Sequence, residues 1–246
     1  LISSVNVPLE TGFTTISANT SKMRNSGFEL SINANVLKSD QFSWNLAYNF
    51  GSNKNKLLSY NNDFAALYGY RDDAYAFKVG NSSSAIYGYQ WAGVNPDTGA
   101  EMFYGPDGTI KTAAEINALP ISNVQVIGEC LPDFQGGLFN NFSYKNLELS
   151  FNILYSYGAS QIFSYLDEAD GRNLSNRNQS INLIDRWQKP GDITDIPRLN
   201  ISRTIVSNSS RYVYDVSYLK LSNVNLAYKF SDKLSHKLHL KRLLVF

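Results

Sequence analysis

The stretch 136–158, GGLFNNFSYKNLELSFNILYSYG, decides the fold. It predicts two β-strands joined by a tight turn at Lys145 and Asn146. In the second strand one set of alternate residues is apolar, and the other set is polar apart from Leu154. The apolar set is Leu147, Leu149, Phe151, Ile153, Tyr155 and Tyr157. A period of two indicates a strand with one apolar and one polar face.

The length of this strand fits a membrane. A tilted strand of about 11 residues crosses a bilayer, and the tyrosines stand at the end away from the turn, as in the aromatic girdle of a membrane barrel. The hairpin alone leaves two interpretations open. It is either a transmembrane hairpin with its polar face toward a lumen, or a soluble sandwich hairpin with its apolar face in a core.

A second hairpin follows the same pattern. Apolar and polar residues alternate along 28–36 and again along 42–50, with a turn at Ser39 and Asp40. The apolar set is Phe28, Leu30, Ile32, Ala34, Val36, Phe42, Trp44, Leu46, Tyr48 and Phe50. Aromatic residues bracket Leu46 on both sides, as two interfacial girdles would require. This arrangement favours the membrane interpretation.

The lengths of the connections also favour a membrane barrel. Further strands are predicted at 84–94, 100–104 and 211–230 and from 238 onward, which gives about eight strands. Residues 1–20 are predicted to be irregular, and helical turns are expected at 113–118 and 178–188. Short turns at 39–40, 95–99, 145–146 and 231–237 alternate with long loops at 52–82, 105–135 and 159–211. Outer-membrane barrels have short turns on one side and long loops on the other.

One strand does not fit a simple alternation. In 211–230, Lys220 and Ser222 interrupt an apolar face, while Leu219 and Leu221 point the other way. A lysine that faces lipid at mid-membrane costs about 2–4 kcal/mol. We therefore expect either a β-bulge that rotates the middle of the strand or a position of Lys220 above the bilayer.

Composition excludes several classes of protein. The chain has 246 residues, 13% of them aromatic and only 17% charged, with a net charge of +1, so nothing points to nucleic acid. The single Cys130 excludes an internal disulfide framework, and no apolar run approaches the roughly 18 residues of a membrane helix. No signal peptide begins at Leu1, although a barrel must be exported. The membrane interpretation therefore predicts an interior piece of a longer chain.

No catalytic, cofactor or metal site is predicted. His236 and His239 would lie on opposite faces of a strand. The acidic group Asp167, Glu168 and Asp170 lacks the ligand spacing of an EF-hand, and no motif supports Ser-His-Asp catalysis. Asp97 and Asp107 are expected to stabilise their turns through Asx-type hydrogen bonds. Cys130 is expected to be an inert or buried thiol.

Ligand-binding residues cannot be assigned from the pattern. The polar face offers hydrogen-bonding side chains that would contact a solute or simply form a hydrated wall, and the second interpretation is favoured. These are Glu29, Asn33, Asn45, Asn49, Glu148 and Asn152. Loop aromatics would stack on sugar rings, pack within the loops or contact a partner lid. These are Tyr68, Tyr70, Tyr75 and Trp187.

Five stretches occur in the order found in one known family. They are NTSKMRNSGFE (19–29), GYQWAGVNPDTGAEMFYGPDGTI (88–110), IGECLPDFQGGLFNNFSYKNLELSF (127–151), RWQKPGDITDIPRL (186–199) and SYLKLSNVNLAYKFSDKL (217–234). Together they resemble the C-terminal barrel region of SusC/RagA-type TonB-dependent outer-membrane transporters of Bacteroidetes. Ser21 stands where that family usually has glycine. The family's plug domain and TonB box are not in the sequence, and the context of Phe246 looks internal.

The resemblance implies an all-β fold, an antiparallel transmembrane β-barrel segment. The whole barrel would have 22 strands, and this fragment would form an open arc of it. Residues 1–246 would form a partial barrel domain that lacks the plug, early strands and true C-terminus. The implied function is TonB-dependent uptake of oligosaccharides or peptides across the outer membrane. Partners would be a SusD-like surface lipoprotein, TonB through the missing N-terminal region, and outer-membrane lipid. No cofactor is implied.

Two other functions stay open from the sequence alone. One is a soluble or surface carbohydrate-binding β module without transport activity, and the other is a barrel enzyme. The transporter hypothesis makes three structural predictions. The apolar residues share one side of a curved sheet; the turns 39–40 and 145–146 lie at one end, with the long loops at the other; and the first and last strands do not pair with each other.

Overall fold

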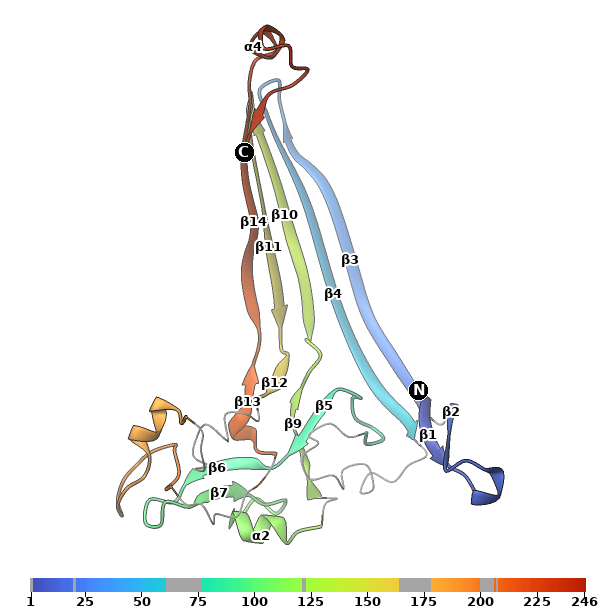
Figure 1. The fold of residues 1–246 in the computed structure, drawn as a ribbon, viewed down its shortest axis with the longest axis vertical. Helices are drawn as coiled ribbons and strands as arrows, with labels where there is room; N and C mark the ends of the chain where they lie inside the picture. Colours follow the sequence, from blue (N-terminus) through green and yellow to red (C-terminus); the bar gives the residue numbers. More distant parts are fainter. Residues whose placement is uncertain are drawn as a thin grey trace. The chain divides into compact units, whose positions relative to one another are not determined.

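The computed structural model describes residues 2–19, 21–60, 77–120, 123–163, 178–199, 206 and 208–246. These residues are mostly antiparallel β-structure with few helices, as predicted (Figure 1). They divide into two compact units. The sheet unit contains Ser26–Lys54, Pro132–Ala159 and Val216–Phe246, and the loop unit contains Leu1–Asn25, Asn55–Leu131 and Ser160–Asp215. No helix within the described residues is long and apolar enough to cross a membrane.

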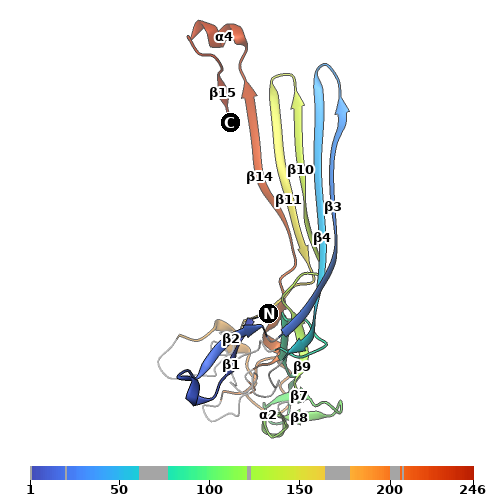
Figure 2. The ribbon, with the colours of Figure 1, turned by 90° about the vertical axis from the view of Figure 1, so that its right-hand side faces the viewer.

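The sheet unit is one open antiparallel sheet of six strands. Its order is β15-β14-β11-β10-β4-β3, and Figure 2 shows the long strands side by side. The strands are β3 (Ser21–Lys38), β4 (Phe42–Tyr60), β10 (Phe134–Tyr144), β11 (Leu147–Tyr157), β14 (Tyr218–Lys229) and β15 (Leu244–Val245). Among the described strands, β3 and β15 form the two edges and do not pair with each other, which confirms the predicted open arc.

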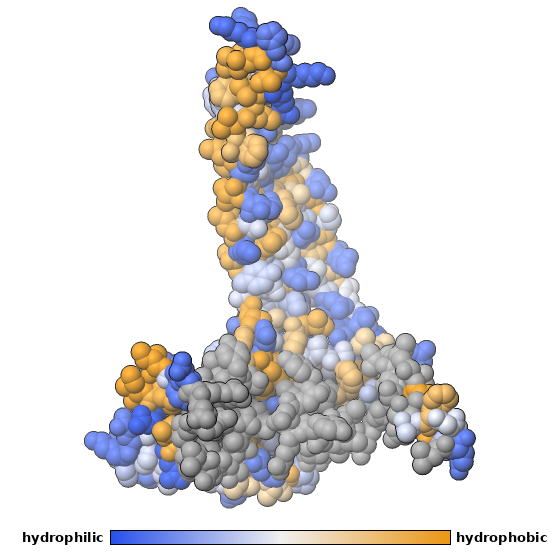
Figure 3. Space-filling view, viewed as in Figure 1, coloured by the Kyte–Doolittle hydropathy of each residue, from blue (hydrophilic) through white to orange (hydrophobic). Residues whose placement is uncertain are grey.

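The registers confirm which residues share a face. Directly paired residues point to the same side of a sheet, and Trp44, Phe142, Leu149 and Leu226 form one row across four strands. The aromatic rings on this side lie in contact, with centroids 5.3 Å apart for Trp44 and Phe142 and 6.3 Å apart for Phe28 and Phe50. We call this side the apolar face. Figure 3 shows apolar side chains in a column along the sheet.

The irregularity in the last long strand is a β-bulge. Between the pairs Ser150–Asn225 and Asn152–Ser222, β14 has one residue more than β11, and Asn223 has a φ of 51°. The extra residue shifts the alternation, so Leu219 and Leu221 join the apolar face while Lys220 pairs with Leu154 on the opposite, polar face. The bulge confirms the first of the two explanations offered for Lys220.

The ends of the sheet match the predicted topology. Tyr144 pairs with Phe42, and the amide of Lys145 donates to the carbonyl of Gln41 at 2.8 Å, so the turns 39–40 and 145–146 lie at one end. At the other end the Ser52 hydroxyl donates to the Asp133 carbonyl at 2.7 Å. There the chain leaves the sheet toward its long connections.

The loop unit contains small sheets and short helices. Its elements are the pair β1 (Ile2–Asn6) and β2 (Thr15–Asn19), the pair β5 (Ala85–Gly88) and β9 (Gln125–Glu129), the meander β6 (Gln90–Val94), β7 (Glu101–Tyr104) and β8 (Ile110–Thr112), and the pair β12 (Ser160–Ile162) and β13 (Val213–Asp215). The helices are α2 (Ala113–Asn117) and the 3-10 turns η1 (Leu9–Thr11), η4 (Ile181–Asp185) and η5 (Ser210–Tyr212). Phe103, Ile116, Ala113 and Val206 form a buried cluster.

Two of the eight predicted strands do not belong to the large sheet. The segments predicted at 84–94 and 100–104 form β5, β6 and β7 in the loop unit. With four or five residues each, they are shorter than the roughly 9–11 residues that cross a bilayer. The four residues of β5 are all buried, whereas a barrel strand exposes one face. The turn at 95–99 therefore belongs to the loop unit and not to the large sheet.

Other boundaries also differ from the predictions. Residues 1–20 are not irregular but form β1, η1 and β2, and β4 continues to Tyr60 into the predicted loop. The long strand predicted at 211–230 is interrupted between β13 and β14. The predicted turn at 231–237 is the helix α4 (Asp232–Lys237), and the last strand begins at Leu244, not at Leu238. The helical turn near 113–118 is confirmed as α2, capped by Thr112 and Glu115.

Candidate functional site

The polar face of the sheet is the largest candidate site. Its rows run across β4, β10, β11 and β14, and the middle row consists of Asn45, Asn141, Ser150 and Asn225. Amides offer both donors and acceptors without charge. The strand alternation that puts apolar residues on one side therefore builds a neutral, hydrogen-bonding wall on the other.

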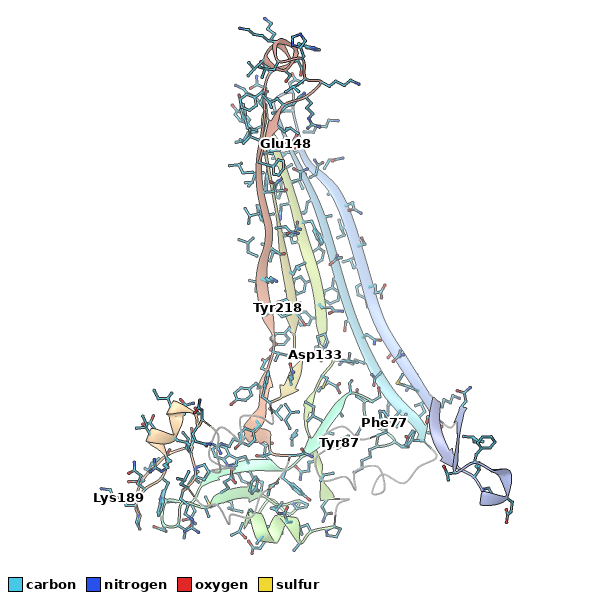
Figure 4. The ribbon with its side chains drawn as sticks, viewed as in Figure 1. Phe77, Tyr87, Asp133, Glu148, Lys189 and Tyr218 are labelled. Carbon is cyan, nitrogen blue, oxygen red and sulfur yellow. The ribbon has the colours of Figure 1, made fainter. Side chains whose placement is uncertain are left out.

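This wall is hollowed in two places. A hollow of about 380 Å³ lies over the middle of the sheet and is lined by Asn33, Asn35, Asn45, Asn141 and Asn152, among others. A larger one of about 540 Å³ lies nearer the end with the long connections and is lined by Glu29, Asn49, Gln135 and Tyr218, among others. The sequence-predicted polar residues except Glu148 thus line one or the other hollow. Glu148 lies on the same face near the turn end (Figure 4).

One polar residue lies on the apolar face. Asn140 pairs with Leu46 and Phe151 and is almost completely buried. Its Oδ1 accepts a hydrogen bond from Trp44 Nε1 at 3.2 Å, so the indole both covers the amide and satisfies its oxygen. The alternation in the sequence does not reveal this pair, because only the register brings Trp44 beside Asn140.

Replacing Trp44 with phenylalanine keeps the aromatic ring but removes the donor. We expect this change to lower the free energy of unfolding by about 1–3 kcal/mol, because the Asn140 oxygen loses its partner in an apolar surrounding. The thermal midpoint of the full-length protein in detergent measures the loss. Adding Asn140→Leu removes the unpaired amide and is expected to restore most of it. Equal midpoints for wild type and Trp44→Phe would show that the hydrogen bond contributes nothing.

The buried ion pair of the loop unit was missed by the sequence reasoning. Arg211 donates to Glu101 at 3.3 Å, and both side chains are about nine-tenths buried, with 9% and 8% of their surfaces exposed. The guanidinium also lies 5.4 Å from the Trp91 ring centre and donates to the Tyr212 hydroxyl at 3.0 Å. Because these residues are far apart in sequence, only the fold could show their contact. The cluster joins β6 and β7 to η5.

Two of the recognised sequence stretches pack against each other. The indole Nε1 of Trp187 donates to the Pro96 carbonyl at 2.8 Å, and the amide of Arg198 donates to the Gly99 carbonyl at 2.9 Å. A Cβ atom on Gly99 would lie 2.4 Å from the Trp187 ring, so the ring needs glycine there. Trp187 thus packs within the loop unit, which was one of the three roles predicted for the loop aromatics. Tyr68, Tyr70 and Tyr75 lie outside the described residues.

The predicted turn residues have different roles. Asp107 stabilises its turn as expected, and hydrogen bonds from Thr109 and Lys111 lower its pKa to about 2. The prediction for Asp97 is wrong, because Asn95 Oδ1 accepts the amides of Asp97 and Thr98 at 2.9 and 3.1 Å. The side chain two residues earlier in the chain makes the Asx turn.

The remaining candidates do not assemble a reactive site. His236 lies in α4 and not on a strand, and His239 follows the helix with a φ of 59°. Cys130 is half-buried, and Asp167, Glu168 and Asp170 fall outside the described residues. Within the part of the chain that the structure describes, no three histidine, cysteine or acidic side chains are placed to hold a metal ion.

Comparison with known proteins finds relatives that match most of the chain. No protein-family model matches the chain. The TonB-dependent receptor P39 of Formosa agariphila is 28% identical over 284 residues, which cover 97% of this chain and 27% of the relative. The TonB-dependent receptor SusC of Bacteroides thetaiotaomicron is 24% identical over 246 residues, which cover 94% and 23%. The chain is thus similar over nearly its whole length to TonB-dependent receptors of the SusC type.

Solved structures share the fold of this receptor segment. The RagAB peptide transporter superposes with a TM-score of 0.76 at 20% identity, over 95% of this chain and 25% of that one. The RagAB peptide importer in its open-open state gives 0.74 at 21% identity, over 96% and 25%. The chain therefore spans about a quarter of the length of the proteins it matches. These relatives are named as receptors and transporters.

Proposed function

We propose that this chain forms part of the wall of a TonB-dependent transporter in the outer membrane of a Gram-negative bacterium. Residues 1–246 would be a partial barrel domain, and other parts of the polypeptide would complete a barrel of about 22 strands and supply the plug domain of its lumen. The apolar face would contact lipid and the polar face would line the lumen. The likeness to SusC and RagAB supports this assignment of the two faces.

One observation carries the proposal: the apolar face is uncovered. On β14 alone, Leu219, Leu221, Val224 and Leu226 are 76%, 60%, 61% and 55% exposed. Exposed apolar bands of this extent are rare on soluble monomers, since they promote association. A soluble carbohydrate-binding module would cover this side with a second layer, and within the described residues the sheet has none. The membrane alternative explains both the apolar side chains and their exposure.

The transported solute and the partners follow from the relatives by analogy. We propose uptake of oligosaccharides or peptides, with a SusD-like surface lipoprotein closing over the loops and TonB supplying energy through a plug domain. The paired naming of RagAB supports a two-component assembly. The amide-rich polar face supports passage of hydrophilic solutes.

Fractionation of cells that produce the full-length protein tests the location. We expect the protein in the outer-membrane fraction, resistant to carbonate extraction and soluble only with detergent. Uptake of a labelled oligosaccharide or peptide mixture should then require both this protein and TonB. Recovery as a soluble periplasmic or secreted protein without detergent would refute the proposal.

A further inference from the structure

A glycine, Gly51, lines part of the larger hollow on the polar face. Gly51 pairs with Gln135, and a Cβ atom added to Gly51 would meet nothing within 4 Å. Glu29 of β3 lies on one side of it and Tyr218 of β14 on the other, and Asn49 lies beside it in β4. Tyr218 is half-exposed and lies at the end of the sheet away from the turns (Figure 4). The hollow therefore has polar flanks and an open floor.

One flank carries an acidic residue, and a basic residue lies next to the other flank. Glu29 lines the hollow from β3, and its carboxylate makes no ion pair with any described residue. Lys220 lies two residues along β14 from Tyr218, on the same polar face, and pairs with Leu154, another lining residue. Between the flanks the lining is neutral, with Asn49 and Gln135 as hydrogen-bonding side chains. Glu148, the other acidic residue on this face of the sheet, lies near the opposite end (Figure 4).

The bulge in β14 puts Lys220 on the polar face. Without the extra residue at Asn223, a regular alternation from Tyr228 would put Lys220 on the apolar face. Bulges occur where a strand re-aims a side chain next to a functional site. Here the bulge places Lys220 on the polar face, on the opposite side of the sheet unit from Glu29 in β3.

We propose that this hollow is a binding site for a zwitterionic solute, whose positive group lies toward Glu29 and whose negative group lies toward Lys220. The inference rests on the proposed function, because it needs the polar face to line a solvent-filled lumen. β3 and β14 are separated by four strand spacings, or at most about 19 Å at 4.7–4.9 Å per spacing. An extended peptide of about five or six residues with free termini spans that distance.

A cysteine placed in the hollow tests the charge pattern directly. The full-length receptor carries Gly51→Cys in a background with Cys130→Ser, and its labelling rates by a cationic and an anionic methanethiosulfonate reagent are compared at low salt. We expect Glu29→Gln to slow the cationic reagent and Lys220→Gln to slow the anionic one, each about threefold or more, with the effects shrinking in high salt. Ala47→Cys, which lies in the smaller neutral hollow, is the matched control and should respond to neither substitution.

Protection by defined solutes tests binding. The pentapeptide Ala-Gly-Ser-Gly-Ala with free termini should slow labelling of Cys at position 51, while the same peptide with acetyl and amide ends and maltopentaose should not. The inference would be overturned if free and capped peptides protected equally. It would also be overturned if neither Glu29→Gln nor Lys220→Gln changed the labelling rates. A Cys at 51 that neither reagent reaches in an outer-membrane receptor would overturn it too, because another part of the polypeptide then fills the hollow. Only a receptor absent from the outer membrane would contradict the proposed function itself.

Discussion

Replacing Leu221 with arginine is expected to remove most of the folded receptor from the outer membrane. Leu221 pairs with Ile153 in the middle of β11 and is 60% exposed on the apolar face. If that face contacts lipid, an arginine near mid-membrane costs about 2–4 kcal/mol. The amount of full-length protein that migrates in its folded, heat-modifiable form after outer-membrane extraction measures the loss.

The neighbouring residue provides the control. Ser222 lies next in β14 but faces the polar side, where it pairs with Asn152. Ser222→Arg should leave the yield of folded receptor close to wild type, since water reaches that face. If the two arginine variants fold equally well, the apolar face does not contact lipid at this level. If Ser222→Arg alone is lost, the two faces have been assigned the wrong way round.

Replacing Arg211 with methionine is expected to destabilise the loop unit by about 3–5 kcal/mol, because it leaves the carboxylate of Glu101 buried without its cation. Both partners are nearly inaccessible, and Arg211 also covers Trp91. Hydrogen exchange of residues 85–129 in the full-length receptor should speed up accordingly. Peptides from β10 and β11 serve as the internal reference.

An exposed ion pair in the same unit is the control for the effect of burial on the Arg211–Glu101 pair. Lys111 and Asp107 are 3.1 Å apart, but the Asp107 side chain is 55% exposed. Lys111→Met should cost no more than about 1 kcal/mol. The double variant Arg211→Met with Glu101→Leu should recover much of the stability, since an apolar pair can replace a buried ion pair. A double variant as unstable as Arg211→Met alone would show that packing around the guanidinium matters more than the charge.

The sequence predicted the large sheet well because its strands alternate over long distances. In β11 the apolar residues from Leu147 to Tyr157 repeat every second position, and a register slip of one residue would reverse both faces. Even the anomaly at Lys220 pointed to a bulge, because a lipid-facing lysine is costly. The two turns and the open edges followed from the same pattern.

The loop unit was harder to predict because its structure depends on contacts between distant segments. β5 is buried on both faces, so its sequence carries no alternation that would show which sheet it joins. The Glu101–Arg211 pair and the packing of Trp187 on Gly99 join residues about a hundred positions apart. The Asx turn was assigned to Asp97 because both Asn95 and Asp97 can make it, and only the backbone path decides between them.

Cysteine scanning along β11 tests the central claim most directly. Single cysteines from Leu147 to Tyr157 in the full-length receptor, in a Cys130→Ser background, are labelled in native membranes with a lipid-soluble maleimide and with a charged, membrane-impermeant one. We predict strict alternation. Positions 149, 151 and 153 should react with the lipid-soluble reagent, whereas positions 148, 150 and 152 should react with the charged one. Labelling of all six positions by the charged reagent would contradict a transmembrane strand, and so would protection of the apolar set from both.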